Sequence, residues 1–205
     1  TISHLRYVRI GSRVPVVLPE RIIDDAELHA VYRKFLFSGK QLYLTTQYNH
    51  PRELNSASLN AVQYLKEDGV IVNNQTVLLK GVNDEPEVLA ELQASLASNG
   101  IIPYYVFQCR PVTSVQDAFQ LPLSRSCQVV DQARQLLDGL SKRFRFVMSH
   151  PTGKIEILGW CDGGIYAKYL QTNRSALHNR IFYKPLPDDA GWLDTTVPEM
   201  DAPCC

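Results

Sequence analysis

The chain has 205 residues, 45% of them hydrophobic, and its 21 lysine and arginine residues balance 21 aspartate and glutamate residues. This length suffices for one sizeable core, and the balanced charge argues against nucleic acid or an anionic membrane as a partner. No apolar run of 18 residues is present, so we expect a cytoplasmic protein without a membrane segment.

The cysteines are odd in number and scattered: Cys109, Cys127, Cys161, Cys204 and Cys205. Such a set argues against a disulfide framework and favours reduced thiols. No CxxC or CxxxCxxC spacing occurs, so the sequence offers no recognisable zinc or iron–sulfur ligand set, and we expect no metal site in this chain.

Hydrophobic periodicity and turn residues predict alternating strands and helices. In chain order we expect an extended run over 4–10, a loop through Pro15 and Pro19, a helix over 26–37 with Asp24 and Asp25 as its N-terminal cap and dipole partners, a strand over 41–47, a helix over 56–68, a strand over 70–79, a helix near 87–98, a strand over 101–109, a loop with Pro111 and Pro122, a helix over 126–142 and a strand over 143–148. This alternation favours βα units in a parallel sheet.

The last fifty residues have a different pattern. KIEILGW and IYAKYLQ predict an antiparallel hairpin, with Asp162-Gly163-Gly164 supplying the positive φ angles of its turn. The predicted fold class is therefore α/β, and we expect two parts: a β/α portion over 1–150, and a hairpin and tail over 151–205.

Polar residues gather at the carboxyl ends of three predicted strands, in RIGSR, TTQYNHPRE and NNQTVLLKGVND. Ligands of parallel sheets bind at that edge, so these clusters suggest a site. Strand alternation divides VNNQTV into one face with Asn73 and Gln75 and another with Asn74 and Thr76. The alternative is structural: the amides cap loops or bond neighbouring strands. No G-x-S-x-G, P-loop or GxGxxG motif is present.

Four longer motifs, YVRIGSRVPVVLPERI, TTQYNHPREL, NNQTVLLKGVND and IPYYVFQC, resemble the lysine 2,3-aminomutase family in order and spacing. The resemblance covers roughly residues 6–154. It implies the carboxyl-terminal part of a radical S-adenosylmethionine enzyme that uses a [4Fe–4S] cluster, S-adenosylmethionine and pyridoxal phosphate in an incomplete parallel β/α barrel. The family's upstream CxxxCxxC motif is absent, so the chain is either a fragment of a longer protein or a short homologue that has lost the reaction.

The resemblance also implies roles for single residues. Asn49, His50 and Gln75 match polar positions at the family's barrel mouth, where the adenosyl group and pyridoxal phosphate lie. Lys154 is the candidate catalytic lysine that anchors pyridoxal phosphate, and Gly153 before it lets the backbone approach a bulky cofactor. The alternative for Lys154 is a surface lysine that opens a hairpin strand.

Two further positions bear on the substrate, a small amino acid in this family. Arg110 falls where the lysine enzyme has an aspartate that holds the distal ammonium, and Ser149 falls near a second such aspartate. Loss of two anions and gain of a cation favours an acidic substrate over lysine. Alternatively, Arg110 pairs with a neighbouring acidic side chain.

Two functions follow from these residues. The first is the carboxyl-terminal part of an aminomutase-like isomerase that is inactive as this chain alone. The second is a non-catalytic homologue that acts as a binding or self-association module. Both predict a homo-oligomer or pairing with the missing barrel half, because an open sheet edge favours association.

Overall fold

The computed structural model describes residue 2 and residues 4–194, so Cys204 and Cys205 lie outside the described residues. The strands are β1 (Tyr7–Gly11), β2 (Gln41–Thr46), β3 (Ile71–Leu78), β4 (Ile102–Gln108), β5 (Arg145–His150), β6 (Gly153–Cys161), β7 (Gly164–Thr172) and β8 (Ile181–Pro185). The helices are α1 (Val14–Val17), α2 (Glu20–Ile23), α3 (Ala26–Phe37), α4 (Ser56–Glu67), α5 (Pro86–Ser98), α6 (Gln116–Phe119) and α7 (Leu123–Gln135), with 3-10 turns η1 (Pro51–Glu53) and η2 (Ser175–Leu177).

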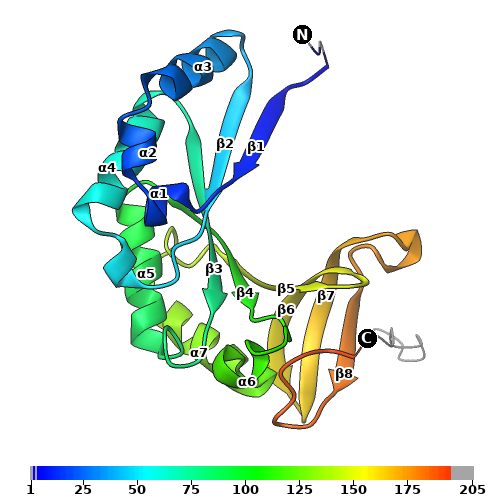
Figure 1. Cartoon of the computed structure of the whole chain (residues 1–205). Helices are drawn as coiled ribbons and strands as arrows, with labels where there is room; N and C mark the ends of the chain where they lie inside the picture. Colours follow the sequence, from blue (N-terminus) through cyan, green and yellow to red (C-terminus); the bar gives the residue numbers. More distant parts are fainter. Residues whose placement is uncertain (1, 3, 195–205) are drawn as a thin grey trace. The chain divides into compact units, whose positions relative to one another are not determined.

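The strands form one sheet in the order β1 to β8, so every neighbour in the sheet is also the next strand along the chain (Figure 1). The pairs β1–β2, β2–β3 and β4–β5 are parallel, whereas β5–β6, β6–β7 and β7–β8 are antiparallel. Helices join the parallel strands, as a crossover connection requires. The predicted fold class is confirmed: an incomplete parallel β/α barrel followed by antiparallel strands.

The chain forms two compact units. Unit 1 runs from the start of the chain to residue 76 and includes 91–104 and 138–143, while unit 2 comprises 77–90, 105–137 and the chain from 144 onward. The predicted domain boundary near residue 150 stays a prediction. None of the helices in the described ranges has the length and apolar run needed to cross a membrane.

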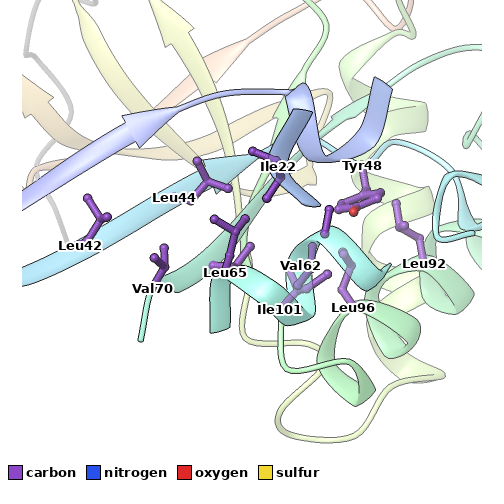
Figure 2. Packing of buried hydrophobic residues seen from close by; sticks show 12 residues of the cluster. Ile22, Leu42, Leu44, Tyr48, Val62, Leu65, Val70, Leu92, Leu96 and Ile101 are labelled. Atoms are coloured by element: carbon purple, nitrogen blue, oxygen red, sulfur yellow. The ribbon is translucent and has the colours of Figure 1, made fainter. Parts of the chain in front are cut away.

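The core of unit 1 lies between its strands and helices. Figure 2 shows Leu42 and Leu44 of β2 on the side of the sheet that faces Leu65 of α4. Alternate residues of each strand point to this side because side chains of a strand alternate between its faces. The fully buried members of the cluster include Tyr48, Ala61, Leu65, Leu92 and Leu96.

Several helix boundaries differ from the sequence prediction. The loop predicted through Pro15 and Pro19 contains the short helices α1 and α2. Proline is compatible with both helices because it lies at their N-terminal ends, where the backbone N–H group has no partner within the helix. The helix predicted over 126–142 begins earlier, at Leu123, and ends at Gln135. The Asp138 carboxylate then accepts hydrogen bonds from the N–H groups of Leu140 and Ser141, a local alternative to helical bonds.

The predicted hairpin is confirmed and continues into a third antiparallel strand, β8, which the sequence prediction missed. Its turn has φ of 53° at Asp162 and 71° at Gly163. The short helix α6 was also missed, in the loop that follows β4. Unit 2 packs α7 against β6 and β7, with Leu123 and Val130 among the buried helix residues.

A buried ionic cluster ties α2, α3 and α4 of unit 1 together. The Asp68 side chain, which is fully buried, contacts the His29 ring through one oxygen and the Arg33 guanidinium, at 2.5 Å, through the other. The second ring nitrogen of His29 donates to the Ile22 carbonyl at 2.7 Å. The His29 ring therefore links the end of α2 to the end of α4.

Replacing Asp68 by asparagine should destabilise the protein by about 2–4 kcal/mol, because it leaves His29 without its buried anion. Urea denaturation followed by circular dichroism measures this change. Glu67→Gln is the matched control, since Glu67 is the exposed neighbour on α4 and its replacement should alter stability by less than about 0.5 kcal/mol. Equal midpoints for Asp68→Asn and Glu67→Gln would contradict the assigned role of Asp68.

Candidate functional site

The first three strands present two different faces within unit 1. One face carries Leu42, Leu44, Val72, Asn74 and Thr76, which are all buried. The pairing places Gly11 beside Thr45, and Thr45 beside Asn73, on the opposite face. This second face is polar, in agreement with the division predicted for VNNQTV, and it is the face on which a ligand could bind.

Asn74 holds the chain where β2 ends. Its side-chain oxygen accepts from the Tyr48 N–H at 2.7 Å, and its amide nitrogen donates to the Tyr48 carbonyl at 3.1 Å. The Thr76 hydroxyl donates to the same carbonyl at 3.0 Å and accepts from Asn74 and Gln93. The structural interpretation of the amides is therefore correct for Asn74. Its side chain supplies the hydrogen bonds that a neighbouring strand would otherwise make to the buried backbone of Tyr48.

Gln75, one residue further along β3, lines a pocket of about 460 Å³ at the strand ends of unit 1. We call it the strand-end pocket, and it is lined by Arg9, Gly11, Ser12, Arg13, Thr45, Thr46, Gln47 and Gln75. The Thr45 hydroxyl is buried and has no hydrogen-bond partner among the described residues. Two guanidinium groups, the side-chain amides of Gln47 and Gln75, and the unsatisfied hydroxyls of Thr45 and Thr46 give this pocket the means to bind an anionic or carbonyl-bearing ligand.

Asn49 and His50 lie in the loop after β2, and neither lines the strand-end pocket. The Glu53 carboxylate accepts from the N–H groups of Asn49 at 2.5 Å and His50 at 3.1 Å, and it pairs with Arg13. The His50 ring accepts from the Arg52 N–H at 3.1 Å and so caps η1. His50 thus stabilises the turn that follows it. Arg13 connects this loop to the pocket wall, because its guanidinium donates to the Gln47 carbonyl at 3.2 Å.

Lys154 lies on β6 in unit 2 and is half-buried. Its ammonium nitrogen is 4.4 Å from the centre of the Tyr105 ring and 5.6 Å from that of Phe107. Ser149 of β5 is its direct cross-strand partner. The structure thus brings together two of the predicted site residues, Lys154 and Ser149, and adds two aromatic rings from β4.

Arg110 follows β4 in an exposed loop of unit 2. Its carbonyl accepts from the Val112 N–H at 2.9 Å. Across the described ranges, Arg110 forms no ion pair of the kind expected from the structural alternative.

Gly153 has a packing role that the sequence did not predict, and its expected role of admitting a cofactor stays a prediction. A Cβ atom at this position would lie 2.0 Å from the backbone oxygen of Gln171, and the residue has φ of 145°. Glycine is therefore required by the close approach of β7 and by backbone conformation, and cofactor access is not needed to explain it.

The described cysteines are free thiols, as expected from the odd count. Burial raises the pKa of Cys109, and burial together with Asp131 raises that of Cys127 to about 12. Both thiols are consequently protonated at neutral pH, and a metal requires the thiolate. In residue 2 and residues 4–194, no group of three or more histidine, cysteine, aspartate and glutamate residues could hold a metal ion.

Sequence reasoning identified the polar strand ends RIGSR and TTQ as clusters, but it did not single out the residues that line the pocket with Gln75. It also missed Tyr105, Phe107 and Glu53. The signal for the rings was their spacing of two in YYVFQ, which puts both on one face of a strand. Nothing local could connect them to Lys154, about fifty residues further along the chain.

No family model matches the chain. A protein of Aquifex aeolicus provisionally named L-lysine 2,3-aminomutase is 40% identical over 194 residues, which are 94% of this chain and 52% of that protein. The L-lysine 2,3-aminomutase of Methanococcus maripaludis is 37% identical over 75% of this chain and 34% of its own length. The glutamate 2,3-aminomutase of Clostridioides difficile is 35% identical over 58% of this chain and 29% of its own length.

The first similarity covers nearly the whole chain, so it includes both the parallel and the antiparallel strands. The chain is thus similar to proteins named L-lysine 2,3-aminomutase and to one named glutamate 2,3-aminomutase. It spans about half the length of the Aquifex relative and about a third of the other two. The resemblance stated from the sequence motifs is therefore confirmed.

Replacing Gly153 by alanine should destabilise unit 2 by more than about 2 kcal/mol without any cofactor, because the added Cβ meets backbone. Gly159→Ala is the matched control on the same strand, where an added Cβ has nothing within 4 Å. Thermal unfolding of both variants measures the difference. A stable Gly153→Ala protein that fails only in cofactor binding would instead support the cofactor-access explanation.

Proposed function

We propose that the protein containing this chain is an aminomutase, an isomerase that moves an amino group between adjacent carbons of a small amino acid. The observation that carries this proposal is the 40% identity over 94% of the chain to a protein with an aminomutase name. The arrangement of Lys154 and the composition of the strand-end pocket are consistent with it.

Lys154 is proposed as the residue that anchors pyridoxal phosphate. When bound, this cofactor supplies an aldehyde that bonds to amines and a ring that delocalises charge or an unpaired electron. The residues of unit 2 fit such a group, because a primary amine and the Ser149 hydroxyl lie beside each other on neighbouring strands. Lys154 holds the cofactor through its nitrogen, and Ser149 is proposed to contact the substrate.

The strand-end pocket is proposed to bind polar groups of S-adenosylmethionine or pyridoxal phosphate. Gln75 offers a donor and an acceptor, and Arg9 and Arg13 offer positive charge beside the unsatisfied Thr45 hydroxyl. Asn49 and His50 act on this site through the loop that Glu53 and Arg13 hold, although their proposed cofactor contacts remain a prediction.

The described residues do not fit a [4Fe–4S] cluster, which requires three or four thiolates. We assign no step of the reaction to a cluster held by these residues. If the protein generates a radical from S-adenosylmethionine, as the family resemblance implies, we propose that residues other than those of this chain hold the cluster.

Arg110 is proposed to select an acidic substrate. A guanidinium binds a carboxylate through two parallel hydrogen bonds, whereas it repels the distal ammonium of lysine. The glutamate 2,3-aminomutase among the relatives is consistent with such chemistry within the family. Arg110 is exposed and has no ionic partner among the described residues.

Association with another polypeptide is also proposed. β1 is the first strand of the sheet, and Tyr7 on it is 63% exposed. An open strand edge pairs readily with further strands, either of a longer protein or of a second copy.

The free thiols of Cys109, Cys127 and Cys161 are consistent with the reducing cytoplasm, which we propose as the location of the protein.

The anchor role of Lys154 predicts that pyridoxal phosphate followed by borohydride will label this residue in the full-length protein. Peptide mass mapping should find the label on Lys154 and lose it in Lys154→Ala. Lys168→Ala is the matched control, because Lys168 is a half-buried lysine on the neighbouring strand and its removal should leave the label in place. Label confined to other lysines would exclude the anchor role.

The selectivity role of Arg110 predicts tighter binding of glutamate than of lysine to the full-length, cofactor-loaded protein in isothermal titration. Arg110→Ala should weaken glutamate binding about tenfold or more, because a charge-assisted bidentate contact is lost. Arg174→Ala, at another exposed arginine of unit 2, should leave it unchanged. Preference of the unsubstituted protein for lysine would reject the acidic substrate.

A further inference from the structure

The Lys154 side chain lies against the rings of two aromatic residues instead of extending away from the sheet. Its nitrogen is 4.4 Å from the Tyr105 ring centre and 5.6 Å from the Phe107 ring centre. The two rings meet edge to face, with centres 5.6 Å apart and planes at 66°. An ammonium within about 6 Å of an aromatic ring face is attracted by the negative charge density of that face.

Strand register accounts for this arrangement. Tyr105 and Phe107 are two residues apart on β4, so both side chains lie on one face of the strand. Phe107 pairs with Val147 of β5, and Ser149, two residues further, pairs with Lys154 of β6. All of these residues therefore share one face of the sheet, and the long lysine side chain reaches back across β5 to the rings.

The aromatic site is sheltered from water. Tyr105 is only 7% exposed, and Phe107 and Lys154 are half-buried. The rings thus contact the lysine cation, and the partial exclusion of water strengthens this contact.

We propose that Tyr105 and Phe107 are positioning residues for Lys154, whose ε-ammonium their ring faces hold in a resting position when no aldehyde is bound. This proposal rests on the anchor role of Lys154. To bond to the aldehyde carbon, Lys154 must first lose a proton and leave the rings, and one water molecule is released when the bond forms. The rings therefore compete with cofactor attachment, and they also return the amine to one defined place when the cofactor departs.

The resting contact is tested in the cofactor-free, full-length protein containing lysine labelled with carbon-13 at the ε position. The Lys154 signal, identified by its loss in Lys154→Arg, should be shifted upfield by the two rings. Tyr105→Phe keeps the ring and should keep the shift, whereas Phe107→Leu should reduce it and the Tyr105→Leu/Phe107→Leu double variant should abolish it. Tyr166→Leu, which removes an exposed ring elsewhere in unit 2, is the matched control. A Lys154 signal that does not respond to loss of the rings would overturn the proposal.

The competition is tested by titrating pyridoxal phosphate into the same proteins and following the absorbance of the attached cofactor. Loss of the rings should tighten binding about three- to tenfold. Phe107→Leu provides this test even if the double variant does not fold. Weaker binding would mean that the rings contact the cofactor itself, and it would overturn the resting position. Failure of the unsubstituted protein to attach the cofactor at Lys154 would reject the anchor role, and the labelled-lysine spectrum would still decide whether the rings hold the amine.

Discussion

The two hydrogen bonds between the Asn74 side chain and the backbone of Tyr48, one accepted and one donated by the amide, fix the chain of unit 1 where β2 ends. Where β2 ends, the chain leaves the sheet, and its N–H and C=O groups are still buried there. A buried backbone group without a partner is costly, and the Asn74 amide satisfies one donor and one acceptor together. Tyr48 consequently stays in the apolar cluster, and burial raises the pKa of its phenol. The loop that follows starts from a fixed point, which is what allows Glu53 to gather the N–H groups of Asn49 and His50.

Strand alternation explains why the pocket lies on the other face. Asn74 and Thr76 are directed toward the helices, so Gln75 between them is directed away from the helices and toward the strand-end pocket. A sequence of four polar residues within a strand thus has two separate purposes. Asn74 and Thr76 form hydrogen bonds with buried backbone groups, and Gln75 between them lines the pocket in which a ligand could bind.

Much of the parallel sheet could be predicted from the sequence, because the hydrophobic periodicity, the helix-capping residues and the glycines that end helices all indicated the same elements. Asp25 accepts from the Leu28 N–H as expected for an N-cap, and Gly39 has φ of 76° after the helix that it ends. Prediction was incomplete where one residue has two possible uses. Proline marks a loop in general but also starts short helices, as at Pro15, and Gly153 beside a candidate catalytic lysine is needed for strand packing. Long-range contacts, such as that between Lys154 and Tyr105, leave no local pattern to read.

The same reasoning separates the two ways in which a substitution near the candidate site can act. A residue directed toward the helices supports the backbone from which the site is built, so its loss changes stability first and binding only as a consequence. A residue on the opposite face, such as Gln75 or Lys154, contributes little to the helix-packed core, and its loss should alter binding in a protein that still folds. Stability and cofactor attachment therefore have to be measured together for each variant. Only a change in attachment without a change in stability assigns a residue to the chemistry.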